Sequence, residues 1–379
     1  MLRNFLFAIS LSFIAASASA QSFDARFDFG QASATKPQAN DGVDLRLLAD
    51  ADRDGRFDGI DLLEAALVAG GTTDAQRRAA YRQQFNGIVD ELRLSGRVVG
   101  TELDQARAVH EFLHARLLTG GFRDAATTVE GALDQGRFNC ISSVILFRLA
   151  AEKFGLRVHG VEVPGHAYAV VETAAGATVV QTTCPAWFAV LGNDDQRRTM
   201  LQQTLGERAA TDADRAPAAG RRLSDVGLAA IVFYNRGLDH LEAGRYAEAL
   251  AANRAALQLD ARNETARANL LATLNNWSLA EFRNGEAEAA LRLLEQGLAV
   301  APDYELFHEN RIAVYQQTLA HAAANDVALN NSASPAEQRA ALRSCYVRWH
   351  AELLRRGEAA EAQRVASRAE ADPFLRATP

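Results

Sequence analysis

Three short segments in the second half of the chain share one pattern, and this pattern constrains the fold more strongly than any other feature. Each segment starts with glycine and continues with alanine and glutamate: Gly244–Ala249, Gly285–Ala290 and Gly357–Ala362. Gly244 and Gly285 are 41 residues apart, and Gly285 and Gly357 are 72 residues apart. A glycine in front of a helix-favouring run is typical of the tight turn inside a helical hairpin. The sequence therefore predicts a wholly helical region of repeated hairpins.

Small residues stand where the paired helices of the first hairpin come close, at Gly237 and Ala249, and the second hairpin ends in Ala301–Asp303. This arrangement resembles the tetratricopeptide repeat, whose period is about 34 residues. The longer spacings predict lengthened helices and an additional helix near residues 305–324. The resemblance implies that residues 225–373 form a solenoid of tetratricopeptide-like repeats, with a groove that binds a protein or peptide.

Composition and charge narrow the class of protein. Of the 379 residues, 48% are hydrophobic and 23% are charged, which is typical of a soluble globular protein with two or three domains. The net charge is -7 and no long basic run occurs, so nucleic acid is not expected as a partner. After the N-terminus no stretch reaches the roughly 18 to 20 apolar residues that cross a bilayer, so no transmembrane segment is expected.

The first 20 residues have the layout of a secretory signal peptide. A short positive start, Met1–Asn4, precedes the apolar run Phe5–Ala15, and Ala18–Ala20 provides a small-x-small cleavage site. The apolar run is short for a membrane anchor, which is the alternative. We therefore expect an exported protein, periplasmic or secreted, that begins at Gln21.

Residues 21–59 are expected to form a leader that ends in a calcium loop. Carboxylates stand at loop positions 1, 3, 5 and 12, a glycine stands at position 6, and the residue at position 7 contributes its carbonyl. The residues at these ligand positions are Asp50, Asp52, Asp54, Arg56 and Asp61. The loop resembles the dockerin-type calcium loop, in which Asp at position 12 is usual. An acidic, solvated turn is the alternative interpretation.

A cysteine and a histidine stand at positions that favour nucleophilic chemistry. Cys140 precedes the apolar run Val144–Ala150, so it is expected in the first turn of a helix, whose positive end stabilises a thiolate. His166 follows Pro164–Gly165 and opens a strand-like run. A neighbouring imidazole is the usual base for a thiol nucleophile. The sequence therefore predicts a Cys-His pair across a helix and a sheet.

The surrounding pattern predicts an α+β domain. Apolar residues recur at helical spacing over residues 74–94 and 102–118, and strands are expected at 157–163, 166–172 and 177–182. His110 and His114 lie four residues apart, as a metal pair would. No third ligand stands at a recognisable spacing, so we expect both histidines on a helix surface.

The segments Gly136–Ser142, Val163–Ala167 and Gln181–Pro185 together resemble the transglutaminase-like superfamily. The resemblance implies that residues 60–204 form an α+β transglutaminase-like domain, followed by a linker at 205–224. It also implies a papain-like triad in the order cysteine, histidine and acidic residue. Cys140 and His166 match this order, and Gln181 stands at the position of the acid.

Gln181 can replace only part of what an acid does. Its oxygen can accept a hydrogen bond from Nδ1 of His166 and leave Nε2 facing the sulfur, but it provides no charge to stabilise the imidazolium. Reduced activity is expected. Glu172 is an alternative third member, although its place six residues along the same strand is too distant. The main-chain N–H of Cys140, with Asn139 or Gln135, is the expected oxyanion donor, and a helix cap is the alternative role of Asn139.

These features predict an exported cysteine enzyme that acts on amide bonds of a protein or peptide through a Cys140 thioester, by hydrolysis or acyl transfer. The chemistry requires no cofactor, and Ca²⁺ is the one ion that the loop predicts. The alternative is a catalytically impaired scaffold that binds proteins. Cys140, Cys184 and Cys345 are the only cysteines, which excludes a disulfide framework and leaves a Cys140–Cys184 pair open.

Overall fold

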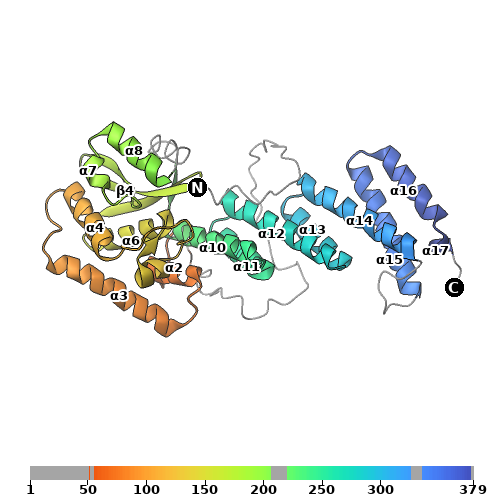
Figure 1. Cartoon of the computed structure of the whole chain (residues 1–379), viewed down its shortest axis with the longest axis horizontal. Coiled ribbons are helices and arrows are strands. Elements are labelled where there is room, and N and C mark those ends of the chain that lie inside the picture. The colour runs from red at the N-terminus through yellow and green to blue at the C-terminus, as the bar shows by residue number, and fades with distance from the viewer. Residues whose placement is uncertain (1–50, 52–54, 206–219, 326–334, 377–379) are drawn as a thin grey trace. The chain divides into compact units, whose positions relative to one another are not determined.

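The computed structural model describes residue 51 and residues 55–205, 220–325 and 335–376 (Figure 1). The chain divides into two compact units, residues 1–269 and 270–379, and each is described by itself. Within the described segments, no helix combines the length and apolar character needed to cross a membrane. The predicted signal peptide at 1–20 lies outside the described residues, so export stays a prediction.

Five helices precede the sheet in the described part of the chain, and side-chain caps explain where they begin. They are α2 (Leu62–Gly70), α3 (Ala75–Leu94), α4 (Glu102–Arg116), α5 (Val129–Gln135) and α6 (Cys140–Glu152). The residue before each helix accepts a hydrogen bond from a main-chain N–H of the first turn; these residues are Asp61, Asp74, Thr101, Thr128 and Asn139. Such caps satisfy N–H groups that a helix leaves unpaired. Two short strands, β1 (Gly121–Phe122) and β2 (Arg137–Phe138), pair in parallel just before α6.

An antiparallel sheet follows α6, with the strand order β5-β4-β3-β6. Its strands are β3 (Arg157–Val163), β4 (His166–Thr173), β5 (Gly176–Val180) and β6 (Arg221–Leu223). The register pairs Val163 with His166 and Ala169 with Val180. The first three strands agree with the predicted ones, which confirms a mixed α/β region with a small antiparallel sheet. β6 forms inside the segment 205–224 that the sequence predicts as a linker.

The core of the first unit lies between α6, one face of the sheet and α10 (Asp225–Glu242). Gly160 in β3 shows how closely these elements approach, since a Cβ there would lie 3.2 Å from Leu228 and 3.3 Å from Val144. Val144, Ile145 and Leu146 of α6 are fully buried. Each such side chain stabilises the fold by roughly 1.5–3 kcal/mol. The first residue of α6, Cys140, is therefore fixed by a well-packed helix.

The first helical hairpin, α10 and α11 (Tyr246–Leu259), belongs to the first unit, although the sequence places it with the repeats. Every residue from Val226 to Tyr234 is buried, and most of them join the same core as α2 and α6. Arg236 of α10 also donates to the carbonyl of Val68 in α2, at 3.3 Å. A helical segment that is apolar on all sides needs partners all round, and the N-terminal half of α10 finds them in α11, α2 and α6.

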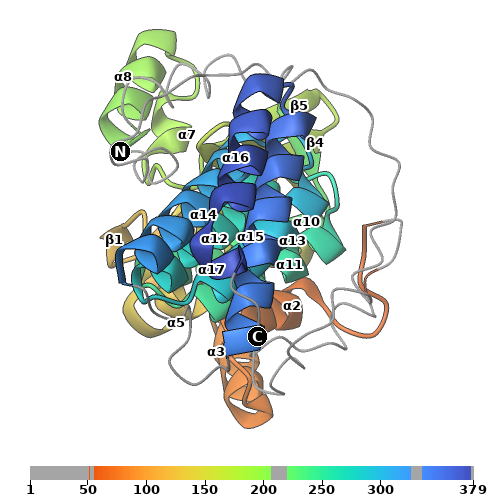
Figure 2. The ribbon, with the colours of Figure 1, turned by 90° about the vertical axis from the view of Figure 1, so that its right-hand side faces the viewer.

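Two short helices of the first unit, α7 (Trp187–Val190) and α8 (Asp194–Leu205), follow β5, and the region after α11 is wholly helical in the described residues. Its helices, in chain order, are α12 (Glu264–Arg283), α13 (Ala287–Val300), α14 (Glu305–Asn325), α15 (Pro335–Arg355), α16 (Ala359–Ala371) and the short α17 (Pro373–Arg376). Within the second unit, α13 packs against α14, α14 against α15, and α15 against α16, and Figure 2 shows α15 and α16 side by side. Buried Glu352 of α15 pairs with His308 and Arg311 of α14. The additional helix expected near 305–324 is α14.

The three recurring glycines form the same turn. Gly244, Gly285 and Gly357 have φ angles of 71°, 87° and 76°, a region that suits glycine because it has no Cβ. In each turn the N–H of the next residue donates to a carbonyl five residues back at 2.9 Å: Arg245 to His240, Glu286 to Glu281 and Glu358 to Leu353. This is the helix-ending bond of the Schellman motif. The predicted helical hairpins are therefore confirmed as paired helices with identical turns.

Candidate functional site

Cys140 is the first residue of α6, and its neighbours set its position by a reciprocal cap. Asn139 Oδ1 accepts from the N–H groups of Ile141 at 2.9 Å and Ser142 at 3.1 Å, while Ser142 Oγ accepts from the N–H of Asn139 at 3.0 Å. Asn139 Nδ2 donates to the carbonyl of Asp124 at 3.3 Å. Both ends of the Asn139 amide are therefore engaged, which favours its role as a cap over that of an oxyanion donor.

The Cys140 thiol is partly buried and strongly favours its neutral form. Burial raises the pKa of Cys140 to about 11, against an opposing effect of the main-chain N–H groups of Ala167, Cys140 and Ile141. The N–H groups at the helix start thus stabilise a thiolate as expected, but the cost of burying its charge is larger than this stabilisation. Cys140, Cys184 and Cys345 all lie in described segments, and none of them forms a disulfide bond.

His166 opens β4 after a turn at Gly165, whose φ is 78°. Its Nε2 lies 2.7 Å from Gln181 Oε1. Because a carbonyl oxygen only accepts, Nε2 carries the proton and Nδ1 keeps a lone pair. The nitrogen bound to Gln181 is thus the opposite of the one expected from the sequence. Burial lowers the pKa of His166 to about 4, and the Gln181 bond opposes this only partly, so the ring is neutral at pH 7.

Gln181 lies directly after β5 and is fully buried. Because Val180 pairs with Ala169, Gln181 lies opposite Tyr168, which is two residues from His166 on β4. The strand register therefore explains why the amide reaches the imidazole. Its Nε2 has no hydrogen-bond partner among the described residues.

The site brings three predicted residues to one end of the sheet. The main-chain N–H of Ala167 stabilises the Cys140 thiolate, so the thiol lies against the residue next to His166, which in turn binds Gln181. Glu172 lies at the other end of β4, opposite Arg157, where its carboxylate is 3.5 Å from His159 Nδ1. This placement separates Glu172 from the Cys140 site.

Comparisons with protein-family models, curated proteins and solved structures gave no match for this chain. The chemistry of Cys140, His166 and Gln181, and of the side chains around them, is therefore the basis for any function of this site. These include groups that the sequence analysis assigned elsewhere or did not consider.

His110 and His114 of α4 are the first such group. His110 is 1% exposed, so the expectation that it lies on a helix surface is wrong. It falls on the same helical stripe as Ala106, Val109 and Leu113, and that spacing is the signal that indicates burial. His114 Nε2 lies 3.0 Å from the carbonyl oxygen of Thr182. Within the described segments, no three potential metal-ligating side chains gather at this or any other place.

Tyr234 of α10 is a second group that sequence reasoning missed. Its hydroxyl donates to Glu162 Oε1 at 3.0 Å, and Arg221 donates to Glu162 Oε2 at 2.6 Å. Burial raises the pKa of Tyr234 well above its usual value. The negative charges of Glu162 and of a Cys140 thiolate raise it further. The first helical hairpin therefore supplies a side chain to the electrostatic surroundings of Cys140.

The calcium loop is described only in part. Asp50, Asp52 and Asp54 lie outside the described residues, whereas Arg56 and Asp61 lie inside. Gly55 has a φ of 86°, as the sharp turn of such a loop requires. Asp61 Oδ1 accepts from the N–H of Glu64 at 2.9 Å, and its Oδ2 lies 2.5 Å from Arg82. The carboxylate expected to close the loop thus caps α2 and pairs with Arg82, and calcium binding stays a prediction.

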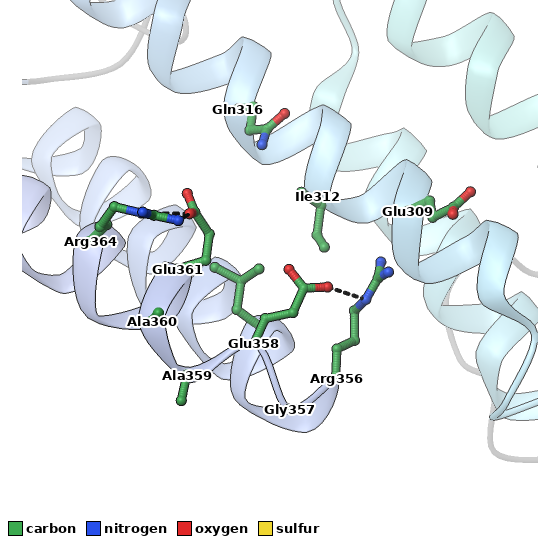
Figure 3. Close-up of a pocket in the computed structure, with 11 residues that line it drawn as sticks. Glu309, Ile312, Gln316, Arg356, Gly357, Glu358, Ala359, Ala360, Glu361 and Arg364 are labelled. Atoms are coloured by element: carbon green, nitrogen blue, oxygen red, sulfur yellow. Dashed lines mark hydrogen bonds and ion pairs between the residues drawn. The ribbon is translucent and has the colours of Figure 1, made fainter.

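The second unit contains a cavity of about 640 Å³ between α14, α15 and α16 (Figure 3). Its lining includes Ile312 and Gln316 of α14, together with the turn at Gly357. Figure 3 shows two pairs of charged side chains in its lining: Arg356 is 2.9 Å from Glu358, and Arg364 Nε is 2.6 Å from Glu361. The cavity therefore offers apolar surface and largely compensated charge.

Proposed function

We propose that this chain is an exported, transglutaminase-like cysteine enzyme that hydrolyses or transfers acyl groups from amide bonds of a protein or peptide. The observation that carries the proposal is the buried hydrogen bond between His166 Nε2 and Gln181 Oε1 beside the Cys140 thiol. It holds the ring as a neutral tautomer whose Nδ1 is a base. The sequence resemblance to the transglutaminase-like superfamily supports the same order of residues.

In the proposed reaction, Cys140 Sγ attacks the carbonyl carbon of the amide while its proton passes to His166 Nδ1. The main-chain N–H at Cys140 stabilises the oxyanion. The C–N bond then breaks, the proton passes from Nδ1 to the leaving amine, and a thioester remains on Cys140. Water or a second amine attacks the thioester, gives its proton to Nδ1, and the thiol is restored.

The proposed resting state is a neutral thiol beside a neutral imidazole. Burial raises the pKa of Cys140 to about 11 and lowers that of His166 to about 4, so a separated ion pair is disfavoured at pH 7. Gln181 adds no charge that would reverse this. Proton transfer therefore accompanies attack on the substrate, and we expect slower turnover than an acidic third residue would allow.

In this proposal the helical hairpins are tetratricopeptide-like repeats that select the protein or peptide partner. The cavity between α14, α15 and α16 supports such a role, because it is open to solvent, partly apolar and lined by paired charges. No cofactor takes part in the reaction. Calcium, bound at the predicted loop, would act on stability alone.

A second candidate is a non-catalytic scaffold of the same fold that binds proteins. One observation favours it, namely the raised pKa of Cys140, since an unassisted thiol of this kind is scarcely ionised at pH 7. The two candidates differ in whether His166 activates the sulfur.

An activated acyl donor tests the proposal without knowledge of the natural substrate. We expect p-nitrophenyl acetate to give a burst of one p-nitrophenolate per chain, with a hydroxylamine-labile acetyl group on Cys140 found by mass spectrometry. Cys140→Ser should abolish the burst, and Cys345→Ala, which removes a buried thiol of the second unit, should keep it. Absence of a burst from the native chain, or a burst that survives in Cys140→Ser, favours the scaffold.

A further inference from the structure

Two imidazoles of α4, buried His110 and half-buried His114, take no part in the proposed reaction but lie beside the site. His114 Nε2 is 3.0 Å from the carbonyl oxygen of Thr182, the residue that follows Gln181. Because the carbonyl oxygen accepts, His114 is the donor and carries its proton on Nε2. The ring of His110 lies next to it, with centroids 4.6 Å apart, and neither of its nitrogens has a hydrogen-bond partner among the described residues.

Thr182 is also held through its side chain. Its Oγ1 lies 2.8 Å from Ser143 Oγ, and Ser143 Oγ donates to the carbonyl of Cys140 at 3.2 Å. Thr182, next to Gln181, is therefore hydrogen-bonded both to His114 of α4 and to Ser143 in the first turn of α6. Its main chain cannot shift without breaking one of these bonds.

The Gln181 amide is hydrogen-bonded at only one of its two polar atoms. Oε1 makes the bond to His166, and Nε2 has no hydrogen-bond partner among the described residues. A side chain with a single polar contact takes its orientation from where its main chain is placed. The bond from His114 to the adjacent carbonyl is therefore well suited to determine whether Oε1 meets His166.

Aromatic contacts tie the same histidines to the cysteine side of the site. The ring of His114 meets Phe138, two residues before Cys140, at 5.6 Å and nearly edge-on. The ring of His110 meets Phe147 of α6 at 6.2 Å. Burial lowers the pKa of His110 to about 3 and that of His114 to about 4, so both rings remain neutral at pH 7 and keep these contacts.

We propose that His114, supported by His110, is a positioning residue that aligns Gln181 with His166. This inference rests on the proposed cysteine chemistry, and it adds a structural requirement that the Cys-His-Gln set does not contain. His114 does not touch the reacting atoms; it acts through the main chain of Thr182.

Three variants separate this role from general packing. His114→Leu removes the donor, and we expect it to slow the alkylation of Cys140 by iodoacetamide at pH 7 by about 10-fold, because misplacement of a catalytic group is costly. His114→Gln keeps an N–H donor at a similar reach and should restore most of the rate. His159→Gln alters a partly buried histidine of β3 that pairs with Glu172, and should leave the rate unchanged. Equal rates in His114→Leu and the native chain, with the fold intact by circular dichroism, would overturn the proposal.

A second measurement uses the native chain and does not depend on reactivity or on the folding of a variant. ¹⁵N shifts of the ring nitrogens should show both His114 and His166 as neutral tautomers with the proton on Nε2. His114 with its proton on Nδ1 would overturn the inference, since Thr182 would then have no donor. If the tautomers are as expected but Cys140 reacts no faster than in the unfolded chain, the cysteine chemistry fails and the positioning role stands.

Discussion

At the scale of single residues, the neutral amide of Gln181 is the feature that most affects the proposed chemistry. Gln181 accepts one hydrogen bond from His166 and leaves the imidazole without a compensating charge. His166 is also fully enclosed, and its pKa of about 4 reflects this environment. The balance between neutral and charged forms of the Cys140–His166 pair is therefore set by burial more than by partners.

Replacing the amide with a carboxylate tests this balance. In Gln181→Glu, a charged acceptor should strengthen the hydrogen bond by about 1 kcal/mol, raise the pKa of His166 and favour its protonated form. We expect Cys140 to be alkylated roughly 5-fold faster at pH 6, the factor that corresponds to about 1 kcal/mol. Gln181→Leu, which removes the acceptor at similar size, should react more slowly than the native chain. Identical rates in the three proteins would contradict a role for residue 181.

At the scale of elements, turns and caps explain where helices start and stop. The positive φ of Gly244, Gly285 and Gly357 ends one helix and lets the next one fold back. The close approach of helices also requires glycine at Gly237, where a Cβ would lie 2.7 Å from the Asn253 amide. These features were visible in the sequence because glycine has few alternatives at such positions.

Two glycines of the first unit allow a matched test of this explanation. A Cβ at Gly244 would meet no atom within 4 Å, so Gly244→Ala tests the backbone alone, and its φ of 71° should make the change cost about 1–2 kcal/mol. Gly87, inside α3, is equally open and helical, so Gly87→Ala should stabilise by about 0.5–1 kcal/mol. Urea unfolding of both variants checks the opposite signs. A Gly244→Ala protein as stable as the native chain would refute the turn geometry.

At the scale of the whole molecule, the sequence predicted those parts of the fold that depend on neighbouring residues better than those that depend on contacts between distant segments. The strands at 157–163 and 166–173 and the hairpin turns depend on nearby residues, and the sequence placed them well. The attachment of α10 to the α/β core depends on surfaces contributed by α2 and α6, which neighbouring residues do not reveal. The first compact unit ends at Asn269, within α12, and so includes α10 and α11.

The same distinction applies to the candidate site. The local sequence context predicted Cys140 and His166, and the resemblance to the transglutaminase-like superfamily implied Gln181 as the third member. It did not predict which ring nitrogen meets Gln181, since that depends on the side-chain geometry of two strands. Nor did it predict the contact of His114 with Thr182, which joins residues 68 positions apart.

The pH dependence of Cys140 alkylation tests the central claim most directly, namely that His166 activates the sulfur. If Nδ1 takes the thiol proton, the rate should rise as His166 loses its proton near pH 4 and then stay level from about pH 5 to 9. The plateau should vanish in His166→Gln. An unassisted thiol with a pKa of about 11 would instead react about 10-fold faster with each pH unit up to that pKa, and about 100-fold more slowly at pH 7 than a thiol of pKa 9.0. Such a steady rise in the native chain, unchanged in His166→Gln, would contradict the account.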